Sequence, residues 1–199
     1  MGTNAQRTTS KYFTIVFGQI TRTVSEDTAN AKERETKTGK KVFELTYESI
    51  YGKITTIAIK EDKKFGDKLF IVLNDGIEVC TVQMPVDSRY FVNLISKLPN
   101  LLPTKNYCLA PYEFVNENGK RIAGVNVYEG TDKTGKKIDA YFTKENPNGL
   151  PDFPPAPYEK EDIMVYTAQR TKFLKKVLLE NQNRFQQTGN EHGDYFDEN

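Results

Sequence analysis

Asp75-Gly76 constrains the fold more than any other feature, because it separates two runs in which apolar and polar residues alternate. The runs are KLFIVLN before the dipeptide and IEVCTVQM after it. Asp-Gly between alternating runs is a strong signal for a β-hairpin. Asn118-Gly119 separates NYCLAPYEFV from RIAGVNVYE in the same way. The sequence therefore predicts two antiparallel hairpins and a fold built mainly of β-strands.

The chain before the first hairpin also has strand character. Residues 11–22 alternate and predict a first strand, whereas the charged residues 25–40 predict a loop. Residues 42–60 are rich in β-branched and aromatic side chains and predict two strands, or one strand sharply bent at Gly52. After the second hairpin, KIDAYF at 137–142 predicts further antiparallel sheet. Three phenylalanines that share faces with aliphatic residues are expected in the core: Phe13, Phe17 and Phe43.

Two segments have helical periodicity. Apolar residues recur at helical spacing in SRYFVNLISKLP, which Asp87 or Ser88 can cap and which Pro99 ends. Residues 158–186 carry a second apolar stripe beside several Lys and Arg residues and predict a C-terminal helix. The five prolines of NPNGLPDFPPAP, at 146–157, predict a stiff connector between the strands and this helix.

These elements predict an all-β fold with appended helices. One helix after the third strand region, followed by a hairpin, is the order found in an OB-fold, a five-stranded Greek-key barrel. We therefore expect an OB-fold-like five-stranded barrel with extra hairpins and a C-terminal helix. The expected organisation is a disordered N-terminus (1–10), the barrel domain (11–145), the connector (146–157), the helix (158–186) and a disordered tail (187–199).

Charge is segregated along the chain. The last nine residues, EHGDYFDEN, contain four carboxylates and no Lys or Arg. Subtracting these four from the 27 acidic residues leaves 23 against 28 basic ones, so residues 1–190 carry a net charge of +5. A basic body favours binding of a polyanion, here single-stranded DNA, and an acidic aromatic tail favours partner recruitment unless it is merely a polar terminus. The residues expected to bind partners are Glu191, Asp194, Tyr195, Phe196, Asp197 and Glu198.

Aromatic and basic residues supply what single-strand binding needs, namely rings that stack on bases and cations that track phosphates. The chain has 12 Phe and 11 Tyr, and the basic string KTGKK occurs at both 37–41 and 133–137. Each such turn, taken alone, is also ordinary solvated turn chemistry. The predicted nucleic-acid-binding residues are Tyr47, Tyr51, Lys53, Lys60, Lys64, Phe70, Tyr112, Lys120, Arg121, Asn126, Tyr128, Lys136 and Lys137.

Enzyme motifs are not evident in the sequence. His192 is the single histidine, and neither Cys80 nor Cys108 has a second ligand at a metal-binding spacing. We expect no enzymatic activity, no cofactor and no metal. No apolar run approaches the roughly 20 residues that span a bilayer, so we expect no membrane partner and a reduced, cytoplasmic location.

The stretch LAPYEFVNENGKRIAGVNVYEG at 109–130, the proline-rich exit and the acidic aromatic tail resemble bacteriophage single-stranded DNA-binding proteins of the OB-fold type. The resemblance implies a protein that coats unpaired DNA during phage replication, recombination or repair. It also implies that replication or recombination proteins are recruited through the tail, inside the bacterial host cell.

Two alternatives remain open from the sequence. The rings could form a protein interface of a phage structural or host-modulating barrel. A metal-dependent nuclease assembled from distant carboxylates leaves no local spacing signature. The oligomeric state, the preference for DNA or RNA and the length of strand bound do not follow from the sequence.

Overall fold

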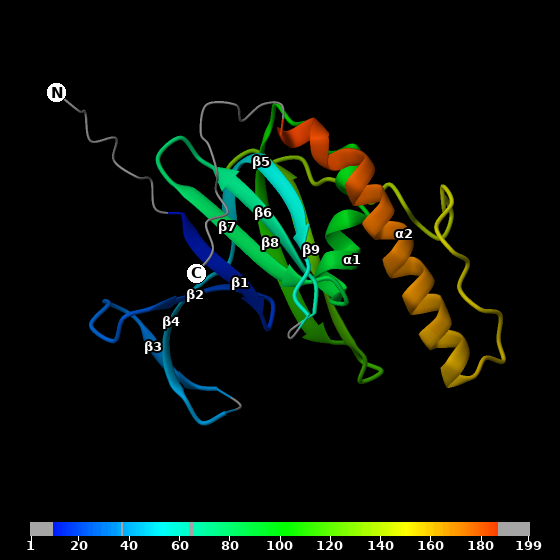
Figure 1. The fold of residues 1–199 in the computed structure, drawn as a ribbon, viewed down its shortest axis with the longest axis horizontal. Coiled ribbons are helices and arrows are strands. Elements are labelled where there is room, and N and C mark those ends of the chain that lie inside the picture. The colour runs from blue at the N-terminus through cyan, green and yellow to red at the C-terminus, as the bar shows by residue number, and fades with distance from the viewer. Residues whose placement is uncertain (1–9, 37, 64–65, 187–199) are drawn as a thin grey trace.

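The computed structural model describes residues 10–36, 38–63 and 66–186 (Figure 1). This part of the chain is mostly β-sheet with a C-terminal helix. The strands are β1 (Lys11–Val16), β2 (Gln19–Val24), β3 (Lys32–Glu35), β4 (Lys41–Tyr47), β5 (Ile50–Lys60), β6 (Lys68–Asn74), β7 (Val79–Pro85), β8 (Asn106–Val115) and β9 (Arg121–Glu129). The helices are α1 (Arg89–Ile95), the short 3-10 helix η1 (Leu98–Asn100) and α2 (Lys160–Gln186).

All nine described strands belong to one sheet, in the order β3-β4-β2-β1-β7-β6-β5-β8-β9. The prediction of a five-stranded barrel is therefore wrong in its strand number. The additional strands are β1 to β4, which join the sheet where β1 pairs in parallel with β7. Figure 1 shows them as a blue extension beside the body that contains β5 to β9.

The β1–β2 hairpin turns through Phe17 and Gly18, which both have positive φ. Phe17 was expected in the core but is 74% exposed, because it occupies the tip of this two-residue turn. Gly18 packs against β8: a Cβ at this position would lie 2.5 Å from the backbone N of Glu113. The Gly18 N–H also donates to the Tyr90 hydroxyl (2.9 Å), which in turn donates to Glu113 (2.5 Å). The hairpin thus reaches across from β7 to β8.

Residues 25–40 contain a strand that the sequence does not predict. β3 consists of the four exposed residues KERE and pairs only with β4. Two kinds of contact stabilise β3. Backbone hydrogen bonds join it to β4, and Arg34 donates to both carboxylate oxygens of Glu44 (2.6 and 2.8 Å). The loop prediction failed here because an edge strand of this kind buries no apolar side chain.

Residues 42–60 form two strands that separate at Glu48 and Ser49, not at Gly52. Gly52 lies inside β5, where its φ is +154° and an added Cβ would sit 3.0 Å from the backbone of Asn74. A β-bulge follows between Ile54 and Thr56. The first part of β5 pairs with β8 and the second part with β6, so the sheet folds over along this strand.

Both predicted hairpins are present, as β6–β7 and β8–β9. The side chain of Asp75 accepts hydrogen bonds from the backbone N–H groups of Ile77 and Glu78, which explains its place in the first turn. α1 begins after Ser88, whose hydroxyl accepts from the Phe91 N–H. The KIDAYF segment does not form a further strand. Only one isolated bridge, between Lys137 and Tyr128, joins it to β9.

The core lies between the two halves of the folded sheet and the helices. β6 contributes Ile71 and Leu73, and β9 contributes Val125 and Val127, all buried. α1 adds Phe91 and Leu94, and the second half of α2 adds Leu174, Leu178 and Phe185. The first half of α2 extends away from this core (Figure 1).

Lys97 is a buried cation beside the edge of β9. Its ammonium group donates to the Val125 carbonyl (3.0 Å) and to the Asn93 carboxamide oxygen (2.6 Å), and the same oxygen accepts from the Val125 N–H. Burial, followed by the nearby charge of Lys137, lowers the pKa of Lys97 to about 8. Asn93 and Lys97 thereby satisfy backbone groups of β9 that none of the described strands pairs.

No helix in the described ranges is long and apolar enough to cross a membrane. Within the same ranges, no group of three or more His, Cys, Asp or Glu side chains is arranged to hold a metal ion.

Candidate nucleic-acid interface

The sheet face opposite the core, here called the outer face, carries most of the predicted binding residues. On this face the strand registers align Tyr51 of β5, Cys108 of β8, Tyr128 of β9 and Lys137 side by side. Neighbouring residues of such a set lie about 5 Å apart. We call these four residues the tyrosine row. It presents two rings with a small side chain between them and a cation at one end.

The rings of the tyrosine row are accessible while Cys108 between them is fully buried. Tyr51 is 43% exposed and Tyr128 is half-buried. Burial raises the pKa of the Cys108 thiol, so this sulfur stays protonated at neutral pH. The row therefore offers flat apolar surfaces without a negative charge, which is the arrangement that base stacking requires.

An ion pair fixes the second KTGKK turn next to the tyrosine row. Lys133 donates to Glu48 at 2.7 Å, and this hydrogen bond lowers the pKa of the Glu48 carboxyl. Glu48 lies in the turn that leads into β5, two residues before Ile50. The pair thus holds the loop that carries Lys136 and Lys137 against the start of the strand that carries Tyr51.

Two further predicted residues, Asn126 and Tyr112, continue the outer face of β8 and β9. Asn126 lies opposite Ala110, and Tyr112 lies opposite Gly124. The Tyr112 ring covers Gly124 so closely that an added Cβ would sit 2.6 Å from its hydroxyl oxygen. Phe114, on the same face, stacks on Tyr112 with ring centroids 6.1 Å apart and is half exposed. Phe114 was missed, although the spacing Tyr112-x-Phe114 predicts two rings on one face.

Phe70 and Lys60 lie on the outer face of the other half of the sheet, on β6 and β5. The Lys60 ammonium nitrogen lies 5.6 Å from the centre of the Phe70 ring, within cation–π range. Gln83 of β7 is opposite Phe70 and also lines a hollow of about 420 Å³ with Tyr12 and Thr14. Tyr12 and Gln83 were not predicted, because β1 reaches this position only through its parallel pairing with β7.

Lys53 occupies the boundary between the two halves. It is opposite Asn74 of β6 and also opposite Asn106 of β8. Because β5 folds the sheet at this point, Phe70 and the tyrosine row lie on outer surfaces of different halves. The structure therefore groups Tyr51, Tyr128, Asn126, Tyr112 and Lys137, groups Lys60 with Phe70, and leaves Lys53 between these groups.

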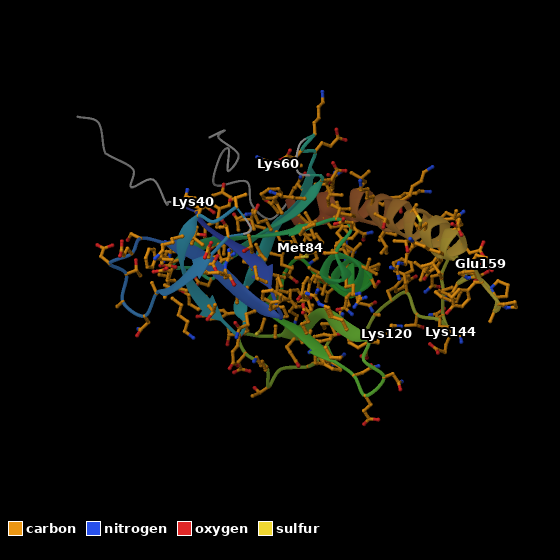
Figure 2. All side chains as sticks on the ribbon, turned by 90° about the horizontal axis from the view of Figure 1, so that it is seen from below. Lys40, Lys60, Met84, Lys120, Lys144 and Glu159 are labelled. Carbon is orange, nitrogen blue, oxygen red and sulfur yellow. The ribbon has the colours of Figure 1, made fainter. Side chains whose placement is uncertain are left out.

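The remaining predicted residues lie elsewhere. Tyr47 of β4 makes an edge-to-face contact with Phe13 of β1, with ring centroids 5.8 Å apart. Arg121 pairs with Glu113 at 2.6 Å, a contact that raises the pKa of Arg121. Lys120 and Arg121 line a separate cleft near α2, and Figure 2 shows Lys120 at the lower side of the view, whereas Lys60 lies at the top. Lys64 and the tail residues that were predicted to bind partners lie outside the described residues.

The two KTGKK strings do not meet. The first leads into β4 at Lys41, whereas the second is held by Glu48, just beyond the other end of the same strand. Six residue steps along a strand correspond to roughly 20 Å. The repeated basic turn therefore contributes to the tyrosine row only through its second copy.

Comparison with known proteins adds no relative: no family model, curated protein or solved structure matches this chain. Any function must therefore be inferred from the arrangement of side chains in the structure.

Proposed function

We propose that this protein binds single-stranded DNA without strong sequence preference and without catalysing a reaction. The tyrosine row is the observation that carries the proposal: two accessible rings in register, with Lys137 at one end and Lys53 nearby. Rings of this kind stack on any base, and cations beside them contact phosphates. A duplex keeps its bases stacked inside and cannot use these rings.

The connectivity of β5 to β9 supports an OB-like assignment for this part of the chain. A long first strand, β5, pairs with both the second strand and the fourth, and α1 lies between the third strand and the fourth. OB-folds bind oligonucleotides on their second and third strands and on two loops at one end. In this proposal β6 and β7 correspond to the second and third strands of the OB-fold, and Phe70 lies on β6. Strands β1 to β4 are then an N-terminal addition.

In biological terms, we propose the role that the sequence resemblance implies. The protein would coat and protect unpaired DNA during phage replication, recombination or repair, in the cytoplasm of the host. The acidic tail would recruit replication or recombination proteins. Separate surfaces suit these two tasks, because a basic, ring-bearing sheet attracts the strand while an acidic aromatic segment attracts proteins.

A competition titration tests the proposal. Fluorescently labelled oligo(dT) is titrated with the protein, and unlabelled dT, rU and duplex compete for it. We expect dT to compete far better than duplex, log affinity to fall with log salt by about 0.7 per phosphate neutralised, and the label to remain uncleaved with Mg²⁺. Equal competition by duplex and single strand, or no binding at low salt, would remove the proposal.

A protein-binding module is the second candidate, favoured by exposed apolar side chains near the start of α2. Phe153, Tyr158, Met164 and Val165 are each 48 to 62% exposed. Exposed apolar clusters are typical of protein interfaces. The double variant F153S/M164S separates the candidates: it should abolish self-association or partner capture, measured by sedimentation, without changing oligo(dT) affinity.

A further inference from the structure

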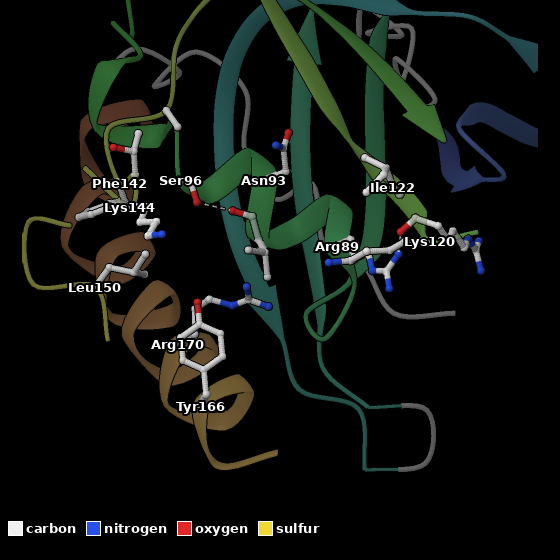
Figure 3. Close-up of a pocket in the computed structure, with 15 residues that line it drawn as sticks. Arg89, Asn93, Ser96, Lys120, Ile122, Phe142, Lys144, Leu150, Tyr166 and Arg170 are labelled. Carbon is white, nitrogen blue, oxygen red and sulfur yellow. Dashed lines mark hydrogen bonds between the residues drawn. The ribbon is translucent and has the colours of Figure 1, made fainter. Parts of the chain in front are cut away.

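A cleft of about 410 Å³ opens between α1, β9, the segment after the barrel and α2, away from the tyrosine row. Figure 3 shows the side chains that line it. Its apolar surface comes from Val92, Ile122, Leu150 and the rings of Phe142 and Tyr166. This volume is within the range typical of small-molecule sites.

The charges that line the cleft all have the same sign. They belong to Arg89, Lys120, Arg121, Lys144 and Arg170, and no Asp or Glu is among the lining residues. Glu113 neutralises Arg121 from outside the cleft. For Lys120, Lys144 and Arg170, no ion-pair partner is found within the described part of the chain. Positive charges gathered along one cleft attract an anion.

Arg170 has a buried hydrogen-bond donor without a partner among the described residues. Its Nε atom is buried and has no hydrogen-bond partner in the described structure. Its guanidinium carbon lies 5.1 Å from the centre of the Tyr166 ring, one helical turn earlier on α2. Figure 3 shows Arg170 extending from α2 into the space below α1. Arg170 as a whole is half-buried, but leaving its Nε donor without an acceptor is costly, and a phosphate can accept from two nitrogens of one guanidinium group at once.

We infer that this cleft binds a nucleoside phosphate, with the phosphate on Arg170 and Lys144 and the base against the apolar wall. The combination of a guanidinium group whose Nε has no described partner, additional cations and a flat apolar surface fits this ligand better than it fits inorganic phosphate, which has no apolar part. The nucleotide is either free or the phosphorylated end of a strand. The inference does not require that the outer face bind DNA, because Tyr51 and Tyr128 do not line the cleft.

Isothermal titration of the full chain with thymidine 5′-monophosphate, thymidine and inorganic phosphate tests the inference. We expect the nucleotide to bind at least about tenfold more tightly than thymidine or phosphate, and Arg170→Gln to weaken it about tenfold or more. Lys172→Gln removes one charge from an exposed position two residues along α2 and should change affinity less than about twofold. Lys144→Gln, on the exposed segment before the connector, should weaken binding in the same direction and guards against misfolding of the Arg170 variant.

Titration with oligo(dT) that carries or lacks a 5′ phosphate distinguishes a free nucleotide from the phosphorylated end of a strand. If the 5′ phosphate raises the affinity for oligo(dT), and Arg170→Gln removes that increase, the ligand is the end of a strand. If Arg170→Gln leaves oligonucleotide binding unchanged but abolishes monophosphate binding, the ligand is a free nucleotide. Either result supports the site. Equal binding of thymidine and its monophosphate, equal effects of Arg170→Gln and Lys172→Gln, or binding of an acidic peptide in place of the nucleotide would overturn it. If Tyr128→Ala loses oligo(dT) binding but still binds the monophosphate, the outer face and the cleft are separate sites, and the result supports the site in the cleft.

Discussion

Removing the rings of the tyrosine row is the sharpest test of the proposed single-strand interface. Base stacking on an aromatic side chain contributes about 1 to 3 kcal/mol per base. Tyr51→Ala and Tyr128→Ala should therefore each weaken oligo(dT) binding by roughly 5- to 150-fold. The two rings are separated by β8, two strand spacings or about 10 Å, so their effects should be nearly additive in the double variant.

The assay is fluorescence anisotropy of labelled oligo(dT) across a series of salt concentrations. A tyrosine carries no charge at neutral pH, so both alanine variants should lower affinity at every salt concentration by a constant factor. Lys137→Gln removes a phosphate contact instead, and should reduce the slope of log affinity against log salt by about 0.7. This difference separates stacking from electrostatic attraction within one experiment.

Tyr158→Ala is the matched control. Tyr158 is 48% exposed, close to Tyr51 at 43%, but it lies between the connector and α2, where its ring contacts Phe153. Its replacement should leave affinity within about twofold. If Tyr51→Ala and Tyr128→Ala fold normally and bind oligo(dT) as well as Tyr158→Ala does, the rings do not stack on bases and the proposed interface is wrong.

Three further predictions concern the fold that holds these surfaces. Because the folded-state pKa of Lys97 is lowered to about 8 from an ordinary value of 10.5, the unfolded state binds more protons between these values. The free energy of unfolding should therefore rise by about 1.5 kcal/mol from pH 8 to 9.5, a rise that Lys97→Met should abolish in urea titrations. Gly18→Val should lower the free energy of unfolding by about 2 kcal/mol or more, because its φ is +73° and the new Cβ would meet β8; unchanged stability would show that the hairpin does not pack there. Ser88→Ala should cost about 1 kcal/mol through loss of the α1 cap, and a thermal shift no larger than that of an exposed serine variant would contradict this.

Local signals predicted the local elements of this fold. Asp75-Gly76 and Asn118-Gly119 specify their hairpins because a turn dipeptide and the alternation around it involve neighbouring residues only. Ser88 likewise specifies the start of α1 through its own side chain. β3 was not predicted because backbone pairing with β4, and not burial of apolar side chains, stabilises it. Phe17 was misassigned because alternation does not reveal that the strand ends one residue earlier.

The candidate sites depend on long-range register, which no local pattern encodes. Tyr51 and Tyr128 were both identified as candidates, but their alignment follows from the pairing of β5 with β8 and of β8 with β9. Residues from four separate segments line the cleft, and among them only Lys120 and Arg121 were predicted as binding residues from the sequence. Arg170 is recognisable in the sequence as one cation among several on α2. Its unpaired Nε becomes visible only when α2 is docked beside α1.

The fold at β5 limits how one strand could use all the predicted residues. Phe70 and the tyrosine row face outward from different halves of the sheet, so a short oligonucleotide can contact one set of rings but not both. Lys53 is the position of β5 that pairs with β6 and β8 at once, so a longer strand passing between the two sets would cross it. A cation at that crossing would neutralise the phosphate where the strand bends around the sheet. The bulge and Gly52, which fold β5, would therefore also determine the path of a strand bound as proposed.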